Sequence, residues 1–136
     1  MNTFKSKERL KHRKKILEIF ANGKSMTEFP IQVVYSTHSE TEQPEIQAGF
    51  SAPKKHFKLA VDRNRRKRLM REAYRLNKQQ LVNEATQLNT SVYMMFIYKT
   101  QSKLNFNEVE QKISLLLNRL CNNLTDPKPN KTIEEK

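Results

Sequence analysis

Residues 53–78 read PKKHFKLAVDRNRRKRLMREAYRLNK. Eleven of them are Lys or Arg and two, Asp62 and Glu72, are acidic, so the stretch carries +9 of the chain's formal net charge of +12. On a helix, which turns by about 100° per residue, four cations spaced four residues apart align in one stripe: Arg63, Lys67, Arg71 and Arg75. The opposite side, which we expect to be buried, carries Leu69, Ala73, Leu76 and Gln80. The stretch therefore predicts an amphipathic helix with one strongly basic face.

This basic face favours a polyanionic partner. Like charges four residues apart destabilise an isolated helix by about 0.2–0.5 kcal/mol per pair, so their alignment suggests a ligand that compensates them. A solvated basic face is the alternative, but such faces usually mix in Glu, whereas this one is rich in Arg, which pairs with phosphate through two hydrogen bonds. With a pI near 10.0, nucleic acid is the first partner to consider and an anionic membrane surface the second.

Composition limits the remaining possibilities. A chain of 136 residues with 36% hydrophobic residues forms one domain with a modest core. No apolar run approaches the roughly 18 residues of a membrane span, and no apolar stretch follows the Lys-rich start as in a secretory signal. Cys121 is the only cysteine, so an internal disulfide is excluded. We expect a chain that works in the reducing cytoplasm.

The hydrophobic pattern predicts an α+β sandwich with the element order α-β-β-α-β-α, one sheet with helices packed on it. The expected elements are a helix at 12–22, strands at 29–36 and 46–51, a helix from 59–62 to about 86, a strand at 92–98 and a helix over 109–124. The first two strands are expected to pair as a hairpin, and the continuous apolar run 92–98 is expected to be the central strand. Asn105 or Asn107 would cap the last helix. We expect one RNA-binding domain over 1–124 and a disordered tail over 125–136.

Signals for catalysis are weak. The three histidines, His12, His38 and His56, show no metal-ligand spacing, and the acidic residues are scattered. A small ribonuclease that uses His12 and His56 as general acid and base is conceivable, although nothing places the two together. With two glycines, the chain has no Gly-rich phosphate loop. The sequence therefore indicates a binder of nucleic acid more clearly than an enzyme with its own active site.

RNA is favoured over DNA as that nucleic acid. No helix-turn-helix, zinc-finger or leucine-zipper pattern is present. Aromatic residues on the expected strands could stack unpaired bases if they face outward, or pack in the core instead: Tyr35, Phe50, Tyr93, Phe96 and Tyr98. Core packing is the better interpretation for Phe50 and Phe96, whereas for Tyr35 and Tyr98 core packing and base stacking are about equally supported.

The residues also carry a family resemblance. Val61-Asp62-Arg63-Asn64-Arg65, followed by Lys67, Arg68 and Arg71, resembles the Arg-Asn-Arg signature of the bacterial ribonuclease P protein component. The flanking segments that agree are 50–55 (FSAPKK), Arg9-Leu10, Phe20, Gly23 and the run 92–98. The resemblance covers about residues 5–124.

The resemblance implies a fold and a function. The fold would be an α/β sandwich with a left-handed βαβ crossover, like the second domain of a small-subunit ribosomal protein. The protein would assist a catalytic RNA that removes the 5′ leader from precursor tRNA, with the hydrolysis done by Mg2+ ions held by the RNA. Its partners would be the catalytic RNA and precursor tRNA, not DNA or a membrane.

The residues of this chain that match functional positions of the family form two groups. Those that match the helix contacting the catalytic RNA are Arg63, Asn64, Arg65, Lys67, Arg68 and Arg71. Those that match the cleft for the single-stranded leader, between the first helix and the sheet, are Phe20, Tyr35, Ser51, Lys54 and Lys55. The chain departs from the family at three places. Ile16 stands where the family often has a Phe in the cleft, and the turn before the signature lacks the usual Gly. The last strand ends in Tyr98-Lys99, where many members have Ala-Arg. A structural protein of the ribosome or another ribonucleoprotein, and a stand-alone nuclease, are the rival functions.

Overall fold

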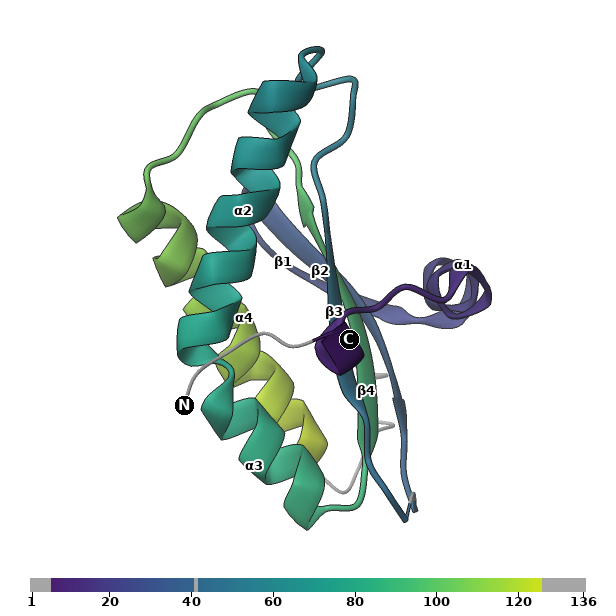
Figure 1. Cartoon of the computed structure of the whole chain (residues 1–136). Coiled ribbons are helices and arrows are strands. Elements are labelled where there is room, and N and C mark those ends of the chain that lie inside the picture. Colours follow the sequence, from purple (N-terminus) through teal and green to yellow (C-terminus); the bar gives the residue numbers. More distant parts are fainter. Residues whose placement is uncertain (1–5, 41, 126–136) are drawn as a thin grey trace, which may run out of the picture.

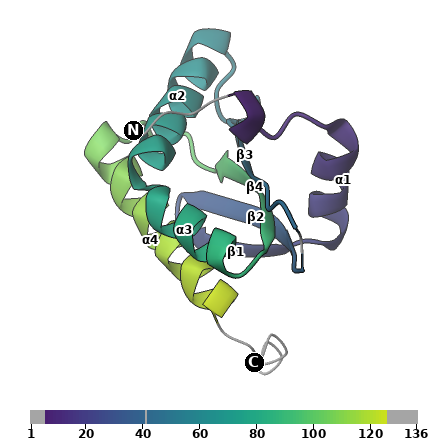
Figure 2. The same ribbon diagram turned by 60° about the horizontal axis from the view of Figure 1, so that its bottom comes forward.

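The computed structural model describes residues 6–40 and 42–125. In chain order its elements are the 3-10 turn η1 (Ser6–Glu8), α1 (Arg13–Asn22), β1 (Lys24–Glu28), β2 (Ile31–His38), β3 (Ile46–Ser51), α2 (Ala60–Asn77), α3 (Gln79–Gln87), β4 (Ser91–Tyr98) and α4 (Phe106–Thr125). The strands form one mixed sheet in the order β1-β2-β4-β3. Helices α2, α3 and α4 cover one face of the sheet and α1 lies alone on the other (Figures 1 and 2). The predicted α+β sandwich is confirmed.

Strand β4 lies inside the sheet, and both of its faces are covered. All eight of its residues are buried, as the continuous apolar run predicts. Because side chains alternate along a strand, Val92, Met94, Phe96 and Tyr98 belong to the larger core beneath α2, α3 and α4. The intervening Tyr93, Met95 and Ile97 form a second, smaller cluster with residues of and before α1.

The predicted hairpin of 29–36 with 46–51 is wrong. Strand β4 lies between the two segments, pairing antiparallel with β2 and parallel with β3. The other neighbour of β2 is β1. Strand β1 was not predicted, because Met26 is the only buried residue in it and the segment therefore has no apolar pattern. The β3–α2–α3–β4 connection joins neighbouring parallel strands, and the two views show it to be left-handed (Figures 1 and 2), against the usual hand.

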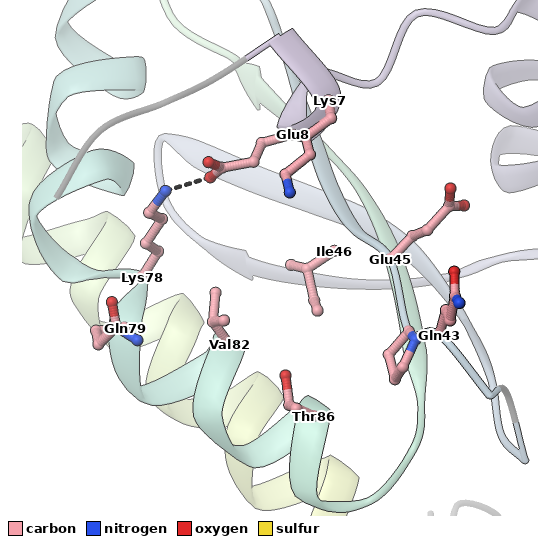
Figure 3. A pocket seen from close by; sticks show the side chains of 10 residues that line it. Lys7, Glu8, Gln43, Glu45, Ile46, Lys78, Gln79, Val82 and Thr86 are labelled. Atoms are coloured by element: carbon pink, nitrogen blue, oxygen red, sulfur yellow. Dashed lines mark hydrogen bonds and ion pairs between the residues drawn. The ribbon is translucent and has the colours of Figure 1, made fainter. Parts of the chain in front are cut away.

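The long basic helix differs from its prediction in two ways. It divides into α2 and α3 at Lys78, whose backbone angles are still helical and whose side chain forms an ion pair with Glu8 of η1 (Figure 3). The buried face of α2 consists of Arg66, Met70, Ala73 and Tyr74. Leu76, 40% exposed, and Gln80 lie outside that face, because the helix turns a different side to the sheet from the one that the pattern indicated.

Of the two predicted caps for α4, Asn105 and Asn107, the structure shows Asn105 in this role. The Asn105 side chain accepts a hydrogen bond from the Glu108 backbone N–H at 2.9 Å, and the Glu108 carboxylate accepts one from the Asn105 backbone N–H at 3.0 Å, a reciprocal capping box. The apolar side of α4 then packs on the sheet through Val109, Ile113, Leu116, Leu117 and Leu120. Thr125, which was predicted to belong to the tail, is helical, and the rest of the predicted tail, residues 126–136, lies outside the described residues.

Candidate nucleic-acid interface

The outer side of α2 forms one wall of a basic groove. The groove has a volume of about 390 Å³ and is lined by Arg9, Leu10 and Lys11, by Ala48, Gly49 and Phe50 of β3, and by Asn64, Lys67, Arg68 and Arg71 of α2. Five of these ten residues are cationic and none of them is acidic. Four of the six residues predicted to bind the catalytic RNA are therefore brought together, and Arg65 is exposed on the same helix. Such a groove can hold phosphate groups without reading base sequence.

Two arginines of α2, Arg63 and Arg66, make contacts within the protein. Arg63, predicted to contact RNA, donates from Nη1 to the carbonyl oxygens of Phe57 and Lys58, both at 2.9 Å. Arg66 is 3% exposed, and its guanidinium lies 5.8 Å from the ring centroid of Phe57 and 5.9 Å from that of Tyr98. These contacts fix the loop that leads into α2, so Arg63 and Arg66 position the basic face.

The predicted stripe of four cations is not uniform. Lys67 and Arg71 line the basic groove, whereas Arg63 supports the loop before α2. Arg75 forms an ion pair with Glu72; hydrogen bonding within this pair lowers the pKa of Glu72 and raises that of Arg75. Of the four residues of the stripe, Lys67 and Arg71 therefore line the groove.

Helix α1 is fixed to the other face along one side. Ile16 and Ile19 pack on the apolar cluster of that face. On one flank, Lys15 lies 3.4 Å from the Glu45 carboxylate and 4.1 Å from the centroid of the Tyr93 ring. The Tyr93 hydroxyl donates to Glu45 at 2.8 Å, and this hydrogen bond, with the charge of Lys15, lowers the pKa of Glu45. The contacts among Lys15, Glu45 and Tyr93 hold this flank of α1 on the sheet.

The opposite flank of α1 carries an exposed aromatic residue. Phe20 follows Lys15 by five residues, which places the two about 140° apart around the helix, and Phe20 is 51% exposed. Ser51, half-buried at the end of β3, pairs with Ile97 and so faces the same side of the sheet as α1. Lys54 and Lys55 follow in the next loop and are exposed. Four of the five predicted leader-binding residues are therefore on the α1 face or on the exposed loop that follows β3.

Tyr35 is the exception, and its predicted place beside α1 is wrong. It is 4% exposed and belongs to the core beneath α2, α3 and α4. Its hydroxyl accepts a hydrogen bond from the Asn123 side chain at 3.0 Å, and burial raises its pKa. The alternation along β2 explains this, since Val33 and Tyr35 point to α4 while Val34 points to α1.

Of the other aromatic candidates for base stacking, Phe96, Tyr93 and Tyr98 are buried, and Phe50 is partly buried and also lines the basic groove. Phe50 and Phe96 stack on each other in the core, and Tyr98 is fully buried with its hydroxyl bonded to the backbone of Ser102 and Leu104. Tyr93 is 8% exposed. Arg9 and Lys11 line the groove although neither was among the predicted binding residues. Their alternation with Leu10 was the available signal, because it is typical of an extended segment with one buried side.

Within the described ranges, no three His, Cys, Asp or Glu side chains gather where they could hold a metal ion. None of the helices there is long and apolar enough to span a bilayer.

The sequence matches one family of known proteins. The family model described as Ribonuclease P matches residues 4–121. The ribonuclease P protein component of Porphyromonas gingivalis is 36% identical over 117 residues, which is 86% of this chain and 85% of the relative. That of Chlorobium phaeobacteroides is 31% identical over 130 residues, 88% of this chain and 89% of the relative.

Solved structures show the same fold. The RNase P protein from Thermotoga maritima superposes with a TM-score of 0.64 at 26% identity, covering 82% of this chain and 96% of that one. The Staphylococcus aureus RNase P protein gives a TM-score of 0.64 at 20% identity, covering 83% and 94%. The matched length, the relatives and the fold together show that the chain belongs to the family of ribonuclease P protein components.

Proposed function

We propose that this chain binds the catalytic RNA of ribonuclease P through the basic groove and binds the 5′ leader of precursor tRNA on the α1 face. The observation that carries the proposal is the groove itself, where five cations and no acidic residue line one cavity. Folded RNA presents closely spaced phosphates, which match such a groove. An extended single strand would instead lie on the α1 face, where Phe20 is exposed for stacking on a base.

In this proposal the chain contributes binding and the RNA contributes the chemistry. Mg2+ ions held by the catalytic RNA supply the hydrolysis of the phosphodiester bond. Lys and Arg of the groove neutralise phosphates of that RNA, while the leader contacts hold the precursor in place. The proposal sets the complex in the cytoplasm, where the buried thiol of Cys121 would remain reduced.

The leader contacts divide by chemistry. Phe20 offers a ring face to a base, and stacking of this kind contributes about 1–3 kcal/mol per base. The Ser51 hydroxyl can donate to a phosphate, and Lys54 and Lys55 add two positive charges beyond the end of β3. These contacts tolerate any sequence, as a subunit that serves many precursors requires.

The test measures the affinity of the reconstituted complex for precursor tRNAs with leaders of increasing length. Phe20→Ala should lower the affinity for precursors that carry a leader, by roughly tenfold for one lost stacking contact, and should leave mature tRNA unaffected. Phe29→Ala is the matched control, because Phe29 is 67% exposed and lines a separate cavity with residues of α4. Equal losses for the two variants, or a loss independent of the leader, would contradict the proposal and favour a purely structural ribonucleoprotein.

A further inference from the structure

The two loops that flank β3 carry opposite charge. The loop before the strand, residues 39–45 (SETEQPE), has three glutamates and no Lys or Arg, whereas the loop after it, residues 52–59 (APKKHFKL), has three lysines and no acidic residue. Figure 1 shows these loops at opposite ends of the sheet. The glutamates of this acidic loop, all of them exposed, are Glu40, Glu42 and Glu45. The sheet therefore has one basic end and one acidic end.

The sheet holds Glu45 in a fixed position. Its backbone N–H donates to the Ser91 hydroxyl at 2.9 Å, and its carbonyl oxygen accepts from the Val92 N–H at 2.9 Å. Its carboxylate accepts from the Tyr93 hydroxyl at 2.8 Å and pairs with Lys15 at 3.4 Å, yet the side chain remains 53% exposed. Figure 3 shows that this side chain points away from α3. Glu45 therefore places a fixed negative charge beside α1 and in contact with water.

The Lys15 flank of α1 is unfavourable for RNA. The Lys15 ammonium group lies 4.1 Å from the Tyr93 ring centroid and faces the Glu45 carboxylate, so its charge is already compensated. Glu18, the one acidic residue of α1, follows three residues later and is exposed, and residues spaced by three share one side of a helix. Phe20 is exposed on the opposite flank. A phosphate chain would therefore meet two carboxylates on one flank of α1, and α1 presents none to it on the other.

This charge distribution acts on a bound strand in opposite ways at its two ends. The lysines of residues 52–59 attract phosphates at one end of the sheet, and the acidic loop repels them at the other. Like charges placed together exclude one arrangement of a complex and so give specificity by repulsion. Glu45 should have the largest effect, because its carboxylate contacts α1 directly.

We propose that Glu45, supported by Glu40 and Glu42, closes one end of the track that the leader follows on the α1 face. The leader runs between Lys54 and the Phe20 flank, and nucleotides beyond this stretch leave the protein instead of passing Glu45. In this role Glu45 is a specificity-determining residue that acts by repulsion. The inference rests on the proposed function, because it takes the leader as the strand bound on this face.

The test is the affinity of the reconstituted complex for precursor tRNAs with leaders of increasing length, at low ionic strength. For the unaltered chain, the affinity should rise with leader length and then level off. Glu45→Gln should raise it about threefold for leaders beyond that length, the factor for removing one charge about 7 Å from a phosphate in water. Shorter leaders should bind as before. The double variant Glu40→Gln/Glu42→Gln, which keeps the contact between Lys15 and Glu45, should change the affinity in the same direction.

A control variant and a change of salt separate repulsion from loss of structure. Glu84→Gln removes the same charge from α3, on the other face of the sheet, and should not alter the affinity at any leader length. The gain from Glu45→Gln should shrink at about 0.5 M salt, because screening weakens interactions between exposed charges. Displacement of α1 would instead weaken leader binding, which is a change of the opposite sign.

The outcomes separate the inference from the proposed function. The inference is overturned if Glu45→Gln matches Glu84→Gln at every leader length. A leader-dependent loss from Glu45→Gln overturns it as well, because the carboxylate would then only position α1. In both cases the proposed function stands as long as Phe20→Ala weakens leader binding. If Phe20→Ala causes no leader-dependent loss, the proposed leader site itself fails and the inference loses its basis.

Discussion

Replacing Gly23 by Ala should push α1 away from the sheet. A Cβ atom at Gly23 would lie 2.4 Å from the carbonyl oxygen of Ile19 and 2.7 Å from that of Tyr35. Both are backbone atoms, so neither can rotate out of the way as a flexible side chain can. Because Ile19 belongs to α1 and Tyr35 to β2, relief of the clash has to separate those two elements.

The expected cost follows from the two contacts. Overpacking costs about 1–3 kcal/mol, and two backbone contacts place Gly23→Ala near the upper end, at about 2–3 kcal/mol. Gly49→Ala is the matched control: its Cβ would meet the end of the Met95 side chain, with Cε at 2.7 Å and the sulfur at 3.2 Å. A methionine end can move aside, so this variant should lose less than about 1 kcal/mol.

Urea unfolding followed by circular dichroism measures both variants. With a urea dependence of about 2 kcal/mol per molar, Gly23→Ala should unfold about 1 M earlier than the unaltered chain. It should also bind the leader more weakly, because displacement of α1 moves Phe20, while its salt slope for the catalytic RNA stays the same. If Gly23→Ala is as stable as Gly49→Ala, the close packing of α1 on β2 described here is wrong.

Three further predictions concern single side chains. Arg68→Ala should lower the salt slope of RNA binding by about 1, measured by filter binding at several salt concentrations; an unchanged slope would argue against a direct phosphate contact. Tyr35→Phe, which removes only the buried hydroxyl, should leave leader affinity unchanged, and a loss would show that this hydroxyl contacts the leader. Ultraviolet titration of the unaltered chain against this variant should show Tyr35 ionising above its usual range, because burial raises its pKa. Glu45→Gln should destabilise the fold at neutral pH by less than about 1 kcal/mol, since the pair is partly exposed. The pKa of Glu45 is lowered from 4.5 in the folded protein, so the ionised carboxylate stabilises the fold above that value and this stabilisation is lost as the pH falls below it. Urea unfolding of Glu45→Gln and of the unaltered chain should therefore show a difference in stability at neutral pH that vanishes in acid.

Several elements could be predicted because one local signal decides each of them. The run from Val92 to Tyr98 has no polar interruption other than tyrosine hydroxyls, so it fits only a strand covered on both faces. The spacing of Asn105 and Glu108 specifies a capping box within four residues. The basic face of α2 is likewise local, because helical periodicity alone aligns its charges.

Features that depend on distant partners could not be predicted. Nothing in the segment Ile46–Ser51 shows that β4, and not β2, is its neighbour, since pairing in a sheet depends on topology. The alternation in β2 separates Val34 from Tyr35, yet it does not reveal which set faces α1. Arg66 has the same local sequence character as its exposed neighbours, and Phe57 and Tyr98, which enclose it, come from elsewhere in the chain.

Cleavage of a precursor tRNA carrying a 5′ leader, at low Mg2+ concentration, shows whether this chain assists a catalytic RNA. Three reactions are compared: the protein alone, the catalytic RNA of the same organism alone, and the two together. We expect cleavage at the mature 5′ end only when both are present. Cleavage by the protein alone would reveal an active site in this chain, and equal cleavage by the RNA alone would show that the protein is not needed.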